Sequence, residues 1–153
     1  MAKIGLLSDS HGRVPTTRAA MRTLIDAGAE VILHLGDVGS EQVLDELVCD
    51  LPVHVVFGNC DYDWQPLAKH AGYMGLIVDH PVGYLDINGR TLVFQHGDNR
   101  NSMAAALAKQ AAYLCHGHTH MKRDEKIGVT RVINPGALQR AMEYTVAVLD
   151  TEQ

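Results

Sequence analysis

The first half of the chain alternates short apolar runs with amphipathic stretches, a pattern that predicts strands separated by helices. A helix is predicted after the first run, where Pro15 suits a first helical position and Gly28 suits the helix end. A second helix is predicted around residues 43–48, whereas residues 61–75, interrupted by proline and glycine, are predicted to be a loop with one helical turn. The apolar runs predict strands at residues 4–7, 31–35 and 53–57. This alternation implies right-handed crossovers and a parallel sheet.

The second half of the chain changes character and predicts antiparallel pairing. Residues 84–87 and 90–94 flank Asn88-Gly89, which suits a two-residue type I′ turn, so this segment is predicted to be a hairpin. The alanine-rich residues 102–110 predict a helix. Further strands are predicted at residues 114–115, 129–133 and 144–149.

Composition and charge narrow the classes of protein that fit. The chain has 153 residues, 46% hydrophobic and 20% charged, and residues 1–153 are predicted to form a single domain. The net charge of −5 argues against broad nucleic-acid binding, which needs clustered lysine and arginine. A phosphate substrate stays compatible with this charge, because bound dications supply positive charge locally.

We expect a cytoplasmic protein that makes no use of a membrane. The chain starts directly on a strand-like segment without signal-peptide architecture, and no apolar run approaches the roughly 20 residues of a membrane span. The cysteines Cys49, Cys60 and Cys115 are scattered and odd in number, which argues against a disulfide framework. The sequence leaves open whether the chain forms a homo-oligomer.

Polar clusters follow several of the apolar runs. The clusters are Asp9-Ser10-His11, Gly36-Asp37, Gly58-Asn59-Cys60-Asp61, His96-Gly97-Asp98 and Gly117-His118-Thr119-His120. In open α/β sheets, ligands gather beyond the carboxyl ends of the strands, where loops from several strands meet. The clusters are therefore expected to converge on one site.

Oxygen and imidazole ligands in these clusters predict a metal centre. The candidate ligands are Asp9, His11, Asp37, Asn59, His96, His118 and His120. Such a set exceeds what one tetrahedral zinc needs but suits two octahedral-like ions that share one carboxylate. Asp37 is the expected bridge, because it lies centrally in the order of motifs. Each residue taken singly is better explained as a cap or a turn, and only their joint order favours a site.

The clusters resemble, in order and spacing, the motifs of the calcineurin-like metallophosphoesterases, over almost the whole chain. The matching residues are Asp9-x-His11, Gly36-Asp37, Gly58-Asn59-x-Asp61, His96 and Gly117-His118-x-His120. Small size, Cys60 in place of the usual histidine, and Asn134-Pro135-Gly136 resemble the compact YfcE-like phosphodiesterase branch, of which Vps29 is a structural relative. The resemblance implies an α/β fold, a four-layer α/β/β/α sandwich of two mixed sheets flanked by helices.

The same resemblance implies two divalent metal ions and a hydrolytic reaction. One ion would be held by Asp9, His11, Asp37 and His120, and the other by Asp37, Asn59, His96 and His118. Manganese is the common activator in this branch, with iron, zinc, nickel and cobalt as alternatives. The implied reaction is hydrolysis of a small phosphate ester, a diester in the first instance, by attack of a metal-bridging hydroxide.

Four further residues are candidates for catalysis or substrate binding. Cys60 stands where the wider family has a histidine thought to assist the leaving group, so it either aids catalysis or marks a tolerated loss. Either role would restrict activity to esters with good leaving groups. Asp61 is a candidate catalytic residue that would orient ligands. Arg13 and Arg100 are candidates for bidentate contact with the substrate phosphate.

The remaining histidines and cysteines are predicted to be structural or solvent-exposed. The histidines outside the motifs are His34, His54, His70, His80 and His116. His34 is predicted to be a hydrogen-bonded core imidazole, and His116 to be structural or to support a ligand. Cys49 and Cys115 are predicted to be small buried hydrophobes.

Two other functions compete with a phosphodiesterase or phosphatase. A protein-interaction scaffold of Vps29 type would keep the fold with an incomplete ligand set, whereas every ligand position here holds a competent residue. A nuclease is disfavoured by the acidic pI and by the lack of an aromatic–basic surface stripe. The sequence thus predicts a metal-dependent phosphoesterase and leaves its natural substrate open.

Overall fold

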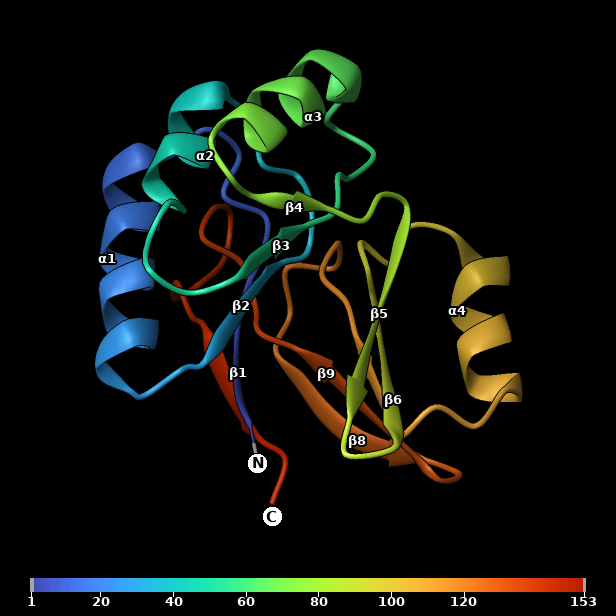
Figure 1. Ribbon diagram of the computed structural model, residues 1–153. Helices are drawn as coiled ribbons and strands as arrows, with labels where there is room; N and C mark the ends of the chain where they lie inside the picture. Colours follow the sequence, from blue (N-terminus) through green and yellow to red (C-terminus); the bar gives the residue numbers. More distant parts are fainter. Residues whose placement is uncertain (1, 153) are drawn as a thin grey trace.

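The computed structural model describes residues 2–152, which form two mixed β-sheets packed face to face (Figure 1). The first sheet has the strand order β10-β1-β2-β3-β4. Its strands β1 to β4 run parallel, and β10 pairs antiparallel with β1. The bounds are β1 (Lys3–Leu7), β2 (Val31–His34), β3 (Val53–Val55), β4 (Ile77–Val78) and β10 (Ala147–Asp150).

The second sheet has the strand order β5-β6-β7-β9-β8. Its central strands β6, β7 and β9 are parallel, and the edge strands β5 and β8 pair antiparallel with their neighbours. The bounds are β5 (Val82–Ile87), β6 (Arg90–Gln95), β7 (Tyr113–Cys115), β8 (Arg123–Ile127) and β9 (Thr130–Asn134).

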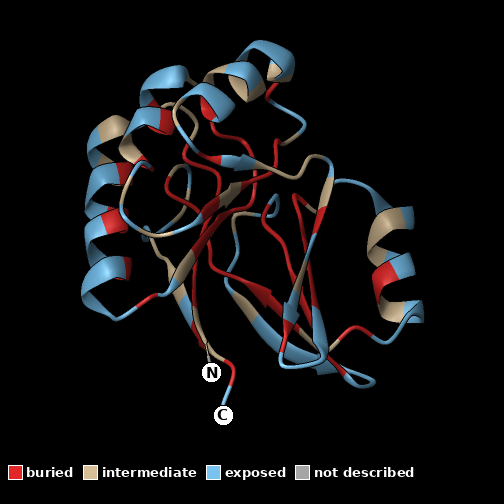
Figure 2. Cartoon of the chain, in the orientation of Figure 1, coloured by how far each residue is buried: buried red, intermediate tan, exposed pale blue. Residues whose placement is uncertain are grey.

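Helices cover the outer face of each sheet. Helices α1 (Val14–Asp26), α2 (Glu41–Glu46) and α3 (Trp64–Tyr73) lie on the first sheet, and α4 (Arg100–Ala108) lies on the second (Figure 1). Buried residues follow the central strands and the inward sides of the helices, while the outward sides are exposed (Figure 2). These layers confirm the predicted α/β/β/α sandwich. No helix within residues 2–152 is long and apolar enough to cross a membrane.

Alternation along each strand divides the apolar residues between the layers. On β1, Leu6 packs between the two sheets, whereas Leu7 packs toward α1 and α2. On β6, Leu92 and Phe94 face the first sheet, whereas Val93 faces α4. Successive side chains of a strand point to opposite faces, so a strand buried on both faces reads as a continuous apolar run.

The predicted hairpin is confirmed. Ile87 pairs with Arg90 at the end of the β5–β6 ladder, which leaves Asn88 and Gly89 as the turn. Their φ angles of 52° and 82° are both positive, as a type I′ turn requires.

The prediction for residues 61–75 is wrong, because α3 occupies most of this segment. Pro66 lies in the first turn of the helix, where a backbone N–H has no intrahelical acceptor and its loss is tolerated. Leu67, Ala68 and Ala71 form an apolar stripe that packs against the core between helices and sheet. Tertiary packing of this stripe therefore outweighs the helix-breaking residues.

At the sheet edges, one predicted strand is shorter than expected and two observed strands were not predicted. The strand predicted at residues 144–149 begins only at Ala147. The two-residue β4 was not predicted, because it is too short to show a pattern. The sequence of β8 is almost entirely charged and exposed, and it forms a strand through antiparallel pairing with β9. An edge strand of this kind carries no apolar alternation by which to predict it.

Candidate metal centre

The structure brings the five polar clusters to one edge of the sandwich. They follow β1, β2 and β3 in the first sheet and β6 and β7 in the second. Backbone hydrogen bonds of 2.9 Å join the loops: Asp9 N donates to Gly36 O, His11 N to Asp37 O, and Gly117 N to His96 O. The carboxyl ends of strands from both sheets thus meet, as expected for a ligand site in an α/β fold.

Asp9 is fully buried and keeps one carboxylate oxygen without a hydrogen-bond partner. Its Oδ2 accepts hydrogen bonds from Ser8 Oγ at 2.6 Å and from the backbone N–H of His118 at 3.1 Å. Its Oδ1 lies 3.4 Å from His120 Nε2 and 3.8 Å from His11 Nε2. Among the described residues, Asp9 Oδ1 and His11 Nε2 are the buried side-chain polar atoms that have no partner. Such orphaned atoms fit a cation-binding site, because buried polar groups are normally satisfied.

Asp37 lies between the two halves of the cluster. Its Oδ1 accepts a 2.9 Å hydrogen bond from the Cys60 backbone N–H, and its Oδ2 lies 3.4 Å from His11 Nε2 and 3.2 Å from His96 Nε2. Burial acts to raise the pKa of Asp37, but the hydrogen bond and charge of His96 outweigh it and hold the pKa well below its usual value. A side chain at Gly58 would collide with Oδ1 of Asp37, which explains the glycine there.

His96 is oriented by a backbone carbonyl. Its Nδ1 lies 2.8 Å from the carbonyl oxygen of Leu35, and since a carbonyl only accepts, Nδ1 carries the proton. Its Nε2 therefore faces Asp37 and the Asn59 Oδ1, which is 3.0 Å away. Burial acts to lower the pKa of His96, but the carboxylates of Asp37 and Asp9 raise it to about 9. A dication at Nε2 would displace a proton, as metal binding to histidine generally requires.

The remaining ligand candidates complete two halves of the cluster. Asn59 Oδ1 lies 3.1 Å from His118 Nδ1, and the rings of His96 and His118 are 5.1 Å apart. On the other side, the rings of His11 and His120 are 5.3 Å apart. Ligand atoms come within 4.8 Å of one another in three groups, namely Asp9/His11/His120, Asp9/Asp37/His96 and His11/Asp37/Cys60. The residues present therefore fit metal ions, and the Cys60 thiol is a neighbour that sequence reasoning did not assign as a ligand.

Most of the candidate ligands have left-handed backbone conformations. The positive φ angles are 56° at Asp9, 45° at His11, 55° at Asp37, 74° at His118 and 62° at His120. Each such residue costs on the order of 1–3 kcal/mol, and such residues concentrate at functional sites. Five of the eight non-glycine residues with positive φ among the described residues are candidate ligands, so we attribute their strain to the geometry of the site.

Asp61 lies beneath the cluster with its carboxylate fully engaged by the backbone. Its Oδ2 accepts from Val38 N at 3.0 Å and Gly58 N at 2.9 Å, and its Oδ1 accepts from Gly39 N at 3.0 Å. These bonds join the loops after β2 and β3. The geometry therefore supports a positioning role for Asp61, in line with the prediction that it orients ligands.

Arg13 and Arg100 lie at the starts of helices next to the cluster. Arg13 precedes α1 and Arg100 opens α4, and both are exposed. Within residues 2–152, neither side chain makes a hydrogen bond or ion pair with the candidate ligands. Their contact with a substrate phosphate stays a prediction.

Two residues outside the candidate ligand set hold the ligand loops: Asn134, whose role sequence reasoning missed, and His116, for which a supporting role was one of the predicted alternatives. Asn134 Nδ2 donates to Gly117 O at 3.1 Å and to Thr119 Oγ1 at 3.0 Å, which fixes the loop that carries the last two histidines. His116 Nε2 lies 3.2 Å from Arg123 Nη1, so its Nδ1 carries the proton and donates to Gly117 O at 2.9 Å. The position of His116 beside the motif was the only signal of this supporting contact.

His34 is a buried, hydrogen-bonded imidazole, as predicted. The Gly36 N–H donates to His34 Nδ1 at 3.1 Å, so Nε2 carries the proton and donates to Ser10 Oγ at 2.9 Å. Ser10 Oγ in turn donates to Val38 O at 3.0 Å. Burial lowers the pKa of His34 to about 4 and keeps the ring neutral.

Two of the remaining histidines pair with carboxylates away from the cluster, and the cysteines differ in burial. His54 contacts Asp79, and His70 contacts Asp45. Cys115 is buried, as predicted, whereas Cys49 is only half-buried at the margin of a core.

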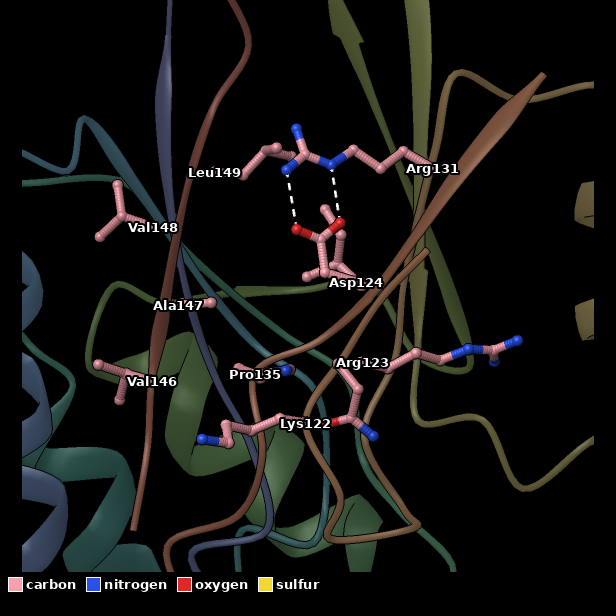
Figure 3. Close-up of a pocket in the computed structure, with 11 residues that line it drawn as sticks. Lys122, Arg123, Asp124, Arg131, Pro135, Val146, Ala147, Val148 and Leu149 are labelled. Carbon is pink, nitrogen blue, oxygen red and sulfur yellow. Dashed lines mark hydrogen bonds and ion pairs between the residues drawn. The ribbon is translucent and has the colours of Figure 1, made fainter. Parts of the chain in front are cut away.

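One cavity lies apart from the candidate ligands, and another borders them. A cavity of about 280 Å³ between β10 and the β8–β9 pair contains the two-pronged ion pair of Arg131 and Asp124 and none of the candidate ligands (Figure 3). A second cavity, of about 270 Å³, includes Gly58 and His96 in its wall and therefore borders the cluster directly.

Comparison with protein families decides which family this fold and cluster represent. Residues 2–153 match the calcineurin-like phosphoesterase superfamily domain. The chain belongs to that superfamily. Among curated relatives of the family, it is 28% identical to phosphodiesterase MJ0936 of Methanocaldococcus jannaschii, covering 99% of this chain and 94% of that protein. It is 30% identical to a probable metallophosphoesterase of Methanothermobacter thermautotrophicus, covering 95% and 84%.

Solved structures of the calcineurin-like superfamily agree with this assignment. An archaeal phosphodiesterase has a TM-score of 0.87 and 26% identity, over 98% of this chain and 94% of that one. YfcE of E. coli has a TM-score of 0.72 at 23% identity over 97% and 88%, and Vps29 of Entamoeba histolytica has 0.62 at 19% over 88% and 74%. At these identities, YfcE and Vps29 bear on the fold alone. Since its relatives are phosphodiesterases and metallophosphoesterases, the protein is a hydrolase of the phosphoesterase class.

Proposed function

We propose that the chain is a binuclear metal-dependent phosphodiesterase that hydrolyses small phosphate esters, with manganese as the expected ion. The observation that carries this proposal is the pair of buried, unpartnered atoms Asp9 Oδ1 and His11 Nε2 beside the ionised Asp37. A buried carboxylate oxygen and a buried imidazole nitrogen are costly without partners, and a bound cation would satisfy both.

Two ions would divide the ligands between them, and Asp37 would serve both. One set is Asp9, His11, Asp37 and His120, and the other is Asp37, Asn59, His96 and His118. The contacts support this division, because His11 and His96 approach the same oxygen, Asp37 Oδ2, at 3.4 Å and 3.2 Å. Bound dications supply Lewis acidity toward the phosphate and a nucleophile at neutral pH.

The protein's own residues fix the ligands and hold their protons in place. Leu35 O keeps the proton of His96 on Nδ1, and the Cys60 N–H fixes one oxygen of Asp37. Asp61 ties together the loops that carry Asp37 and Asn59. Preorganised ligands of this kind need no rearrangement as charge develops on the phosphate.

Cys60 bears on the class of ester. In the metal-free chain, burial and the charge of Asp37 raise the pKa of the Cys60 thiol, and a thiol is a weaker acid than an imidazolium. It gives a leaving alkoxide less help than an imidazolium would. We therefore assign the chain to esters whose leaving groups depart without a proton.

The proposal is tested on chelated protein reconstituted with manganese, zinc, nickel, cobalt or iron(II). Each form is assayed against bis(p-nitrophenyl) phosphate and p-nitrophenyl phosphate. We expect no activity without a dication, with the diester preferred and manganese the best activator. A well-folded protein that stays inactive with every ion would contradict the proposal and favour a scaffold function.

A further inference from the structure

The cavity that borders His96 has an aromatic wall. Phe57, Trp64 and His80 supply this wall, with ring centroids 4.5 Å apart for Trp64 and His80 and 5.6 Å apart for Phe57 and His80. The backbone N–H of Phe57 donates to His80 Nδ1 at 3.1 Å, which fixes the orientation of the histidine ring. Burial lowers the pKa of His80, so the ring is neutral at physiological pH.

The lining of the cavity also has a polar part. It is formed by side chains that accept or donate hydrogen bonds, namely Gln95, Asp98, Asn99 and Ser102. Asp98 is the carboxylate among the described lining residues, which include His96 but neither lysine nor arginine. Away from His96 this lining offers a second phosphate no cationic side chain, whereas an uncharged ring finds hydrogen-bond donors and acceptors here.

Size limits what the cavity holds. Its volume of about 270 Å³ is slightly below the range of about 300–1,000 Å³ typical of complete ligand pockets. It therefore suits one ring system rather than a whole substrate. Because His96 is both a wall residue and a candidate ligand, the cavity adjoins the proposed metal centre, within reach of the ester group of a phosphate held there.

We propose that the cavity formed by Phe57, Trp64, His80 and Asp98 binds the nucleobase of a nucleotide phosphoester. Aromatic walls stack on a planar base, and amide and carboxylate groups recognise its edges. This inference rests on the proposed function, since it assigns a substrate class to the same centre. It makes Trp64 a specificity-determining residue outside the metal site.

Trp64 is the single tryptophan of the chain, so intrinsic fluorescence reports on this cavity directly. The probes are adenosine 5′-monophosphate and ribose 5-phosphate, which share a phosphate and a ribose and differ in the base. Manganese-loaded protein is titrated with each, with excitation at the red edge of the tryptophan band, where adenine does not absorb. We expect saturable quenching by the nucleotide and none by the sugar phosphate.

Competitive inhibition of bis(p-nitrophenyl) phosphate hydrolysis gives a second measurement. Base stacking predicts that the nucleotide binds about tenfold more tightly than ribose 5-phosphate. Trp64→Leu should remove this difference, and Trp64→Phe, which keeps an aromatic face, should retain most of it. Melting curves of both variants show whether they are folded.

The outcomes separate the two proposals. Equal binding of the two probes, with no change in fluorescence by an active enzyme, would overturn the nucleobase subsite and leave the phosphodiesterase standing. Inactivity with every dication would contradict the proposed phosphodiesterase function, while quenching by the nucleotide would still show a base-binding cavity. Loss of the tenfold preference in Trp64→Phe as well as in Trp64→Leu would contradict stacking as its cause.

Discussion

The backbone N–H of Cys60 donates a 2.9 Å hydrogen bond to Oδ1 of Asp37. This bond fixes one carboxylate oxygen and turns the other, Oδ2, toward His11 on one side and His96 on the other. Asp37 thus lies between the two groups of candidate ligands, and for this reason we propose that it would hold both ions. The orientation depends on the main chain of residue 60, so it survives changes to the Cys60 side chain.

Replacing Asp37 should therefore affect both ions. Asp37→Asn is the sharpest variant, because asparagine tolerates the left-handed conformation found there, with φ of 55°. We expect loss of hydrolysis and a reduced content of both metals, measured by elemental analysis of the purified variant. Retention of two tightly bound ions per chain would exclude Asp37 as the bridge.

Asp61 predicts a stability effect. Asp61→Asn weakens the charge-assisted acceptors for three backbone N–H groups, and we expect a loss of about 3 kcal/mol in unfolding free energy. The matched control is Asp63→Asn, an exposed residue whose side chain caps no helix, which should change stability by less than about 0.5 kcal/mol. Urea unfolding of chelated protein measures the stability of both variants. Equal stabilities would show that Asp61 does not hold the loops together.

Cys60 predicts a difference between leaving groups. Cys60→His should raise kcat/KM for alkyl esters more than for nitrophenyl esters, because general-acid help is typically worth about 10²–10⁴-fold where it is needed. Cys60→Ser should leave nitrophenyl hydrolysis nearly intact. Both variants are compared at equal metal occupancy, since a new imidazole also binds metals. An equal change in both substrate classes would exclude leaving-group assistance at this position.

The buried, neutral His34 should make the folded chain less stable in acid. Its pKa is about 4 in the folded chain and about 6.5 when unfolded, so protons bind the unfolded chain preferentially. The neutral ring's contribution is fully present above pH 6.5 and is lost as the pH falls toward 4, an expected change of about 3 kcal/mol. His34→Gln, which keeps an acceptor and a donor, should flatten this part of the pH profile in chelated protein. An unchanged profile would show that His34 does not cause it.

The central strands and the hairpin follow from local patterns in the sequence, whereas the four-layer arrangement and the division of the ligands between two ions were implied by the family resemblance. Apolar runs identify the central strands, and the preference of Asn88 and Gly89 for positive φ angles determines the hairpin turn. Helix α3 and strand β8 could not be predicted in this way, because packing forms the first and pairing with β9 the second.

Parts of the site also lay beyond sequence reasoning. The hydrogen bond of Asn134 to Gly117 O joins residues whose meeting depends on the register of β7 and β9. The aromatic cavity likewise joins Trp64 of α3 to His80 of the loop before β5. Such contacts appear only once the chain is folded.

The most direct test of a binuclear centre is a titration of chelated protein with manganese. Bound ion, far-ultraviolet circular dichroism and hydrolysis of bis(p-nitrophenyl) phosphate are followed together. The core is built without the ligands, so secondary structure should stay unchanged from the metal-free form onward. We predict that activity rises to its maximum only as the second ion per chain binds. Full activity with a single bound ion, or none at saturation, would contradict the account.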